Sequence, residues 1–247
     1  MNQQNKIHFC TVVETHSRHK LKKMKKIFSV LAIVGLSVLA MSSFTKSKMP
    51  SSLMCELCGK ESKSQQLHTA MQKLWADHMI WTYATVDAFY HNSTALQPSL
   101  DRLLQNQKDI GAAIVPFYGK EAGDKLAALL TTHINQAIPV LTAAKNNDKM
   151  ALDKALADWY ANAKDIADFL TAANPKNWSA TATQPMMKTH IDQTTAYAVD
   201  LLKNDYTNAV IKFDEARLHM IEMGTVLASG IIKQFPEKFK ESNAGTK

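Results

Sequence analysis

Several motifs of catalytic chemistry are missing from this sequence. It has no glycine-rich phosphate-binding loop, no Walker sequence and no Gly-x-Ser-x-Gly nucleophile elbow. These absences argue against nucleotide-dependent chemistry. No other motif specifies a reaction or an oligomeric state, so the sequence leaves open whether the protein is an enzyme.

Cysteine is scarce, with three residues in 247. Two of them form a single Cys55-x-x-Cys58 motif, and no second pair accompanies it. No histidine follows Cys58, which removes covalent haem attachment. Thioredoxin-like enzymes place this motif at a helix start within an α/β pattern, which is absent here. The pair is therefore interpreted as a disulfide or two passive thiols, or alternatively as a site of metal delivery or capture.

Excess positive charge is absent from most of the chain. Residues 1–44 contain seven of the 29 Lys and Arg residues and one of the 22 acidic residues, which leaves 22 basic and 21 acidic residues in the rest. A nearly neutral domain lacks the basic surface that nucleic-acid binding requires. We therefore expect no nucleic-acid partner.

The positive charge instead precedes an apolar run, as in a secretory signal. The basic cluster Lys20–Lys26 leads directly into Ile27–Phe44. We interpret residues 1–44 as a leader, of which 24–44 form the signal peptide, and predict that the protein is exported, either periplasmic or secreted.

Cleavage is expected near small residues at Ala40, Ser42 and Ser43. If the signal remained uncleaved, residues 27–44 would form a helix about 27 Å long and could anchor the protein. A membrane is a predicted partner only in that case.

The remainder of the chain predicts an all-α fold. Residues 45–63 are a flexible tether that contains the Cys pair, and residues 64–240 form a single domain. Apolar residues follow a helical period from about residue 64, without strand-like alternation. The expected helices run over about 64–91, from Pro98 to before Pro116, over about 120–145, from Asp148 to Asn174, and over about 183–204 and 206–234.

Short connections between these helices favour an up-and-down bundle. The last helix is apolar on more than one side, which is typical of a helix central to a bundle. We therefore predict an up-and-down bundle of six helices with residues 206–234 near its centre.

Four histidine-led segments recur along the domain. The intervals between their histidines are 55, 57 and 29 residues, which fit a unit of about 28 residues, one helix plus one turn. In an up-and-down bundle this repeat places each histidine at the middle of its helix and at a common height. The segments are His78–Trp81, His133–Gln136, His190–Gln193 and His219–Glu222.

Inward side chains on facing helices are how bundles build metal sites. We predict a site for a transition metal ion, Zn, Fe, Cu or Mn, because imidazole and carboxylate ligands suit these ions. The alternative is a structural polar layer, in which each histidine bonds to an amide or a carbonyl. The candidate ligands or their supporting groups are His78, His133, His190, His219, Asp109, Asp214 and Glu222.

Two other functions remain open. Aromatic residues concentrated near Trp81 and Trp159 could line a cavity for a small apolar ligand, although such residues more often form core. The third alternative is an envelope interaction module without a ligand.

Two longer motifs carry a resemblance. Asn106–Gly119 reads NQKDIGAAIVPFYG, and Gly230–Phe239 reads GIIKQFPEKF. Together with Trp75-x-x-His78-x-x-Trp81, they resemble a little-characterised family of small bacterial all-helical proteins. The resemblance implies one helical domain and no particular activity.

Overall fold

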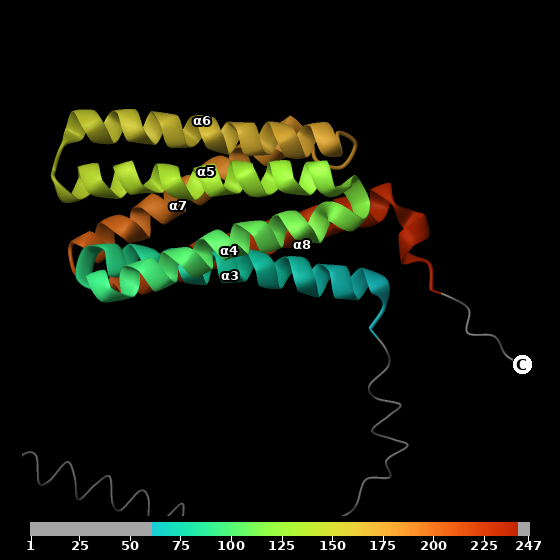
Figure 1. Cartoon of the computed structure of the whole chain (residues 1–247), viewed down its shortest axis with the longest axis horizontal. Coiled ribbons are helices and arrows are strands. Elements are labelled where there is room, and N and C mark those ends of the chain that lie inside the picture. Colours follow the sequence, from blue (N-terminus) through green and yellow to red (C-terminus); the bar gives the residue numbers. More distant parts are fainter. Residues whose placement is uncertain (1–60, 242–247) are drawn as a thin grey trace, which may run out of the picture. The chain divides into compact units, whose positions relative to one another are not determined.

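The computed structural model describes residues 61–241, and this part of the chain folds into helices connected by short turns (Figure 1). The predicted all-α fold is confirmed. The elements are α3 (Lys63–His91), α4 (Ser93–Tyr118), α5 (Lys120–Lys145), α6 (Lys149–Ala173), α7 (Ala180–Leu202), α8 (Tyr206–Gln234) and a closing 3-10 turn, η1 (Pro236–Phe239). The predicted leader, anchor segment and Cys pair lie outside the described residues.

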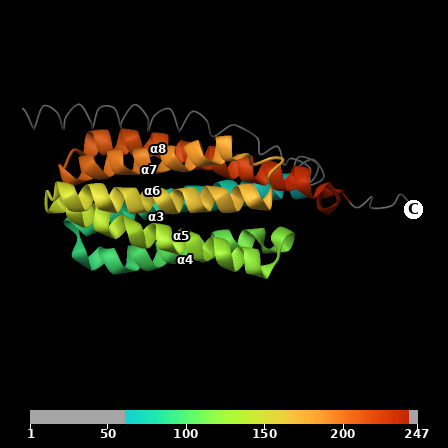
Figure 2. The ribbon, with the colours of Figure 1, turned by 90° about the horizontal axis from the view of Figure 1, so that it is seen from above.

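The helices pack in chain order, as expected for an up-and-down bundle. Each helix contacts the next, and α3 also packs along α8, so the first and last helices close the bundle. Figure 2 shows the same helices from above, with α7 beside α8 and α4 beside α5. Helix α7 also contacts α3 and α5, so it has four neighbours in the described structure: α3, α5, α6 and α8.

Side-chain caps set several helix boundaries. Ser62 forms a capping box with Gln65 at the start of α3, and Asp148 accepts a bond from the Ala151 amide at the start of α6, as predicted. Both ends of α4 differ from the prediction, because the helix begins before Pro98 and continues past Pro116 to Tyr118. Asn92 ends α3 and accepts a bond from the Ala95 amide, so α4 begins at Ser93 and contains Pro98.

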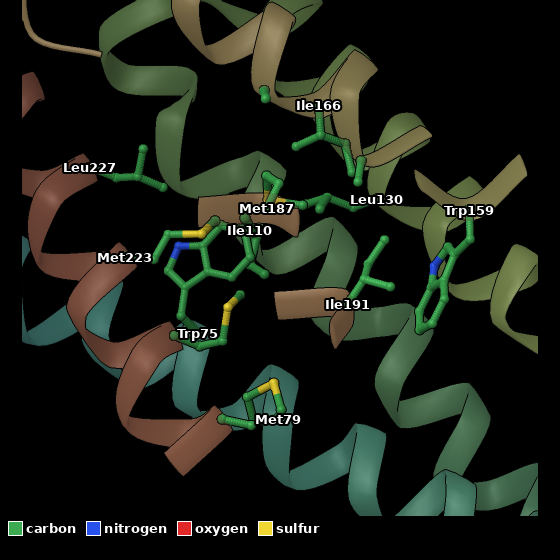
Figure 3. Packing of buried hydrophobic residues seen from close by; sticks show 14 of the residues in the cluster. Trp75, Met79, Ile110, Leu130, Trp159, Ile166, Met187, Ile191, Met223 and Leu227 are labelled. Atoms are coloured by element: carbon green, nitrogen blue, oxygen red, sulfur yellow. The ribbon is translucent and has the colours of Figure 1, made fainter. Parts of the chain in front are cut away.

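The core consists of large apolar side chains from all six helices. Figure 3 shows Trp75, Ile110, Met187 and Met223 directed into the space between their helices. Each of these side chains is almost completely buried. Full burial of one such side chain contributes roughly 1.5–3 kcal/mol, so this core holds the interior layer of the bundle in place.

The prediction that the last helix is central was wrong. Val210, Ile211 and Leu218 on α8 are between 50 and 58% exposed. These apolar residues made the helix look apolar on several sides in the sequence, but their side chains face solvent. The helix with additional neighbours is α7, whose Ile191, Tyr197 and Leu201 are completely buried.

Helices α4 and α5 approach each other at the level of their backbones. A Cβ atom added to Gly111 would lie 2.5 Å from the Gly123 carbonyl oxygen, and one added to Gly123 would lie 2.7 Å from the Gly111 oxygen. Only glycine fits at this distance. Helix α5 is long and apolar enough to cross a membrane, but in this bundle it packs against α4 and α6.

Candidate functional site: a buried histidine layer

Three of the four predicted histidines meet inside the bundle. His78 on α3, His133 on α5 and His190 on α7 are each 1–2% exposed. The ring centroid of His190 lies 5.3 Å from that of His78 and 5.7 Å from that of His133. His190 is therefore the middle member of a buried group of three imidazoles, which we call the histidine layer.

Asn162 orients the His133 ring. The Nδ1 of His133 lies 2.8 Å from Asn162 Oδ1, and Asn162 Nδ2 donates to the Leu129 carbonyl. Because a carboxamide oxygen only accepts, His133 must carry its proton on Nδ1. Its Nε2 is left with a free lone pair, and no hydrogen-bond partner for this buried atom is present among the described residues.

Gln107 contacts the second ring, that of His78. Its Nε2 lies 3.3 Å from His78 Nδ1 and donates to the Leu103 carbonyl at 2.7 Å. His78 Nδ1 therefore accepts in this arrangement, which places the proton of the neutral ring on Nε2. The Gln107 Oε1 atom is buried and has no partner within residues 61–241.

His190 has a buried ring nitrogen, Nδ1, for which the described part of the chain supplies no hydrogen-bond partner. Buried polar atoms without a partner are uncommon because each costs roughly 1–3 kcal/mol. Such atoms are candidates for contact with an ion, a water molecule or a ligand. His133 and His190 thus each present an unpartnered nitrogen in the same layer.

The layer favours neutral imidazoles. Burial first and the neighbouring His133 second lower the pKa of His78 to about 3, against an opposing contribution from the Gln107 contact. Burial likewise lowers the pKa of His133 to about 4. The pKa of His190 lies well below its ordinary value because of burial first and the neighbouring His78 second. At neutral pH all three rings are uncharged, which is the state in which imidazole binds metals.

His219 is placed differently from the other three. Its ring is only partly buried, and its Nε2 donates to the Met186 carbonyl at 2.9 Å. It lies near enough for a positive charge on it to lower the pKa of His190, but it makes no ring contact with the layer in the described structure. The expected common height therefore holds for three histidines, and His219 stands apart.

The three predicted carboxylates lie toward the bundle surface. Asp109 accepts a hydrogen bond from Gln105 and lies 3.6 Å from Arg102. Asp214 is 62% exposed beside Arg217, and Glu222 is exposed. The structure does not bring these carboxylates into the histidine layer, because local partners and solvent satisfy them.

The layer borders a small cavity. Its volume is about 40 Å³, and its walls include all three histidines, Trp159 and Thr194. The Trp159 indole donates to the His133 carbonyl and so ties α6 to α5 at this level. The Thr194 hydroxyl has no partner among residues 61–241.

The rings as they stand do not form a finished metal site. Among the described residues, no group of three or more His, Cys, Asp or Glu side chains is arranged to hold a metal ion. Two nitrogens without hydrogen-bond partners in the described structure, on His133 and His190, are available as metal ligands. The third ring, His78, lies next to His190.

No protein-family model, curated protein or solved structure matches this chain.

Proposed function

We propose that the bundle binds one transition metal ion through His78, His133 and His190. The observation that supports the proposal is the pair of buried, unpartnered nitrogens on the two neighbouring neutral rings of His133 and His190. A metal ion between them would satisfy both atoms. The Asn162 contact supports the same role, because metal-binding histidines commonly hold their second nitrogen in a hydrogen bond that fixes the ring.

The ring separations suit a shared ion after a small adjustment. Two imidazoles on one tetrahedral ion, with bonds of 2.0–2.1 Å, have ring centroids about 5 Å apart. The observed separations of 5.3 and 5.7 Å are close to this value. Both separations involve His190. With the His133 ring held by Asn162, the His78 and His190 rings would have to rotate about their side-chain bonds to direct their nitrogens to one point.

His78 needs an additional change to bind through Nε2, which carries its proton in the described arrangement. A turn of the Gln107 carboxamide would place the unpartnered Oε1 against Nδ1 as an acceptor and free Nε2. The turn would cost the hydrogen bonds that Gln107 Nε2 donates to the Leu103 carbonyl and to Asn106 Oδ1. Metal binding at His78 Nε2 would therefore require the His78 proton to move to Nδ1 and the Gln107 carboxamide to turn.

The ligand set narrows the choice of ion. Imidazole suits Zn, Cu and Fe, whereas Mn prefers carboxylate and carbonyl oxygens. Since Asp109, Asp214 and Glu222 lie outside the layer, the proposal favours Zn, Cu or Fe over Mn. A layer of three protein ligands would leave a fourth position of a tetrahedral ion facing the adjoining cavity.

The proposal is tested by calorimetric titration of chelator-treated, tag-free protein with Zn²⁺. Cys55 and Cys58 are replaced by serine so that they cannot bind the ion. We expect about one ion per chain, loss of binding in His190→Ala and retained binding in His219→Ala, the matched control. Equal binding by both variants, or none in the parent protein, would contradict the proposal.

A further inference from the structure

A second cavity adjoins the one beside the histidine layer. It has a volume of about 70 Å³ and lies among α3, α5, α6 and α7. The two cavities share several wall residues, including Val86, Ala137, Leu141 and Thr194. They therefore lie next to each other along the bundle interior, and one of them ends at the three imidazoles.

The walls of the second cavity are almost entirely apolar. No charged residue lines it. Its polar groups are the hydroxyls of Thr82, Thr194, Thr195 and Tyr90 and the indole N–H of Trp159, which is bonded to the His133 carbonyl. The Thr82 hydroxyl is occupied, because it donates to the His78 carbonyl at 2.7 Å. The buried hydroxyls of Thr194 and Thr195 have no hydrogen-bond partner within the described residues. The Thr194 side chain is 3% exposed and lies near the Tyr197 hydroxyl, which also has no hydrogen-bond partner there.

The size of the cavities limits what can occupy them. A water molecule needs roughly 10–15 Å³ of such space, and an apolar cavity of about 150 Å³ accepts benzene or xenon. Volumes of about 40 and 70 Å³ therefore exceed one water but fall below benzene. An apolar cavity of this kind favours an apolar occupant over water, which needs two to four polar partners.

We propose that these adjoining cavities bind a small uncharged molecule that is mostly apolar and has one hydrogen-bonding atom, such as a short-chain alcohol. Its apolar part would lie against Leu141 and Leu156, and its polar atom would meet the Thr194 hydroxyl. A charged ligand is excluded by the cost of burying a charge without a counterion. The walls also include partly exposed residues, Ile138 on the first cavity and Tyr90 on the second, which mark approaches from the surface.

Binding in these cavities needs no metal ion, so a negative result would not bear on the proposed metal site. The test uses the full chain in chelator, with xenon and 1-propanol as probes and methyl NMR as the readout. We expect saturable shifts confined to the methyl groups of Val86, Leu141, Leu156 and Val199. Absence of shifts at these methyl groups, or shifts spread over the surface, would overturn the proposal.

Two variants that fill the space locate the site. Ala137→Leu fills the wall shared by both cavities, and Ala144→Leu fills the second cavity from a partly exposed position where misfolding is less of a risk. Either variant, once shown to be folded, should abolish the xenon shifts. Ala161→Leu, at an exposed position on α6, is the matched control and should leave them unchanged. Unchanged shifts in a folded cavity-filling variant would contradict the assignment.

A final variant tests the class of ligand. Thr194→Val keeps the side-chain shape but removes the hydroxyl, so xenon binding should persist while 1-propanol binding weakens about threefold to tenfold, as for one lost hydrogen bond. Equal 1-propanol affinity in Thr194→Val and the parent protein would overturn the assigned polar contact.

Discussion

The protonation of His78, His133 and His190 links the layer to the stability of the bundle. In the unfolded chain each ring titrates near pH 6.5, whereas in the folded chain burial lowers the pKa to about 3 for His78 and about 4 for His133. Above pH 6.5 neither state binds a proton, so the rings cause no pH dependence there. Below pH 6.5 the histidines of the unfolded chain bind protons, whereas the buried histidines of the folded chain stay neutral, so folding becomes less favourable.

We therefore expect metal-free protein to lose stability as the pH falls from 6.5 toward 4. Each histidine contributes a slope of about 1.4 kcal/mol per pH unit once the unfolded state is protonated. Urea unfolding between pH 7 and pH 4.5 measures this slope. His190→Gln should reduce it by one histidine's share, and an identical slope in variant and parent would show that His190 takes up its proton in both states.

The close approach of Gly111 and Gly123 makes a prediction at the scale of elements. Gly111→Ala adds a methyl group 2.5 Å from the Gly123 oxygen, so α4 and α5 must separate. Overpacking of this kind typically costs about 1–3 kcal/mol. That cost should exceed the gain in helix propensity, which is at most about 1 kcal/mol.

Thermal unfolding of the variant measures the balance. The neighbouring Ala112 is exposed, so Ala112→Gly changes helix propensity without touching α5 and should cost no more than about 1 kcal/mol. Gly111→Ala should be the more damaging of the two. A stabilised Gly111→Ala protein would contradict the observed helix contact.

The sequence predicted the helices well because their apolar period is a local property. The bounds of α5, α6 and α8 agree with the expectation within a residue or so. The start of α4 was missed because the Asn92 cap is a stronger boundary than Pro98. The burial of α8 was also misjudged, since period alone does not show how a helix is rotated toward its neighbours.

The same limit explains the outcome for the site. The 28-residue repeat placed His78, His133 and His190 at one height. It could not distinguish His219, which has a similar local pattern but bonds to the Met186 carbonyl from a partly exposed position. The orientation of a carboxylate such as Asp109 depends on nearby partners, here Arg102 and Gln105, and the histidine repeat contains no information about them.

For the whole chain, the predicted leader can be tested separately from the helical bundle. The basic cluster before Ile27–Phe44 predicts export and cleavage. Mass spectrometry of the exported protein should find a mature N-terminus between about residues 41 and 50. Recovery of the complete chain in the soluble cytosolic fraction would refute the predicted export.

Locating a bound ion shows whether His78, His133 and His190 together bind one metal ion. Crystals of tag-free protein, loaded with Zn²⁺ after replacement of Cys55 and Cys58 by serine, can be measured at the zinc absorption edge. We expect one anomalous peak inside the bundle, from an ion bonded to nitrogens of His78, His133 and His190 at about 2.0–2.1 Å. Anomalous peaks confined to surface residues such as Asp214 or Glu222, with an empty histidine layer, would contradict it.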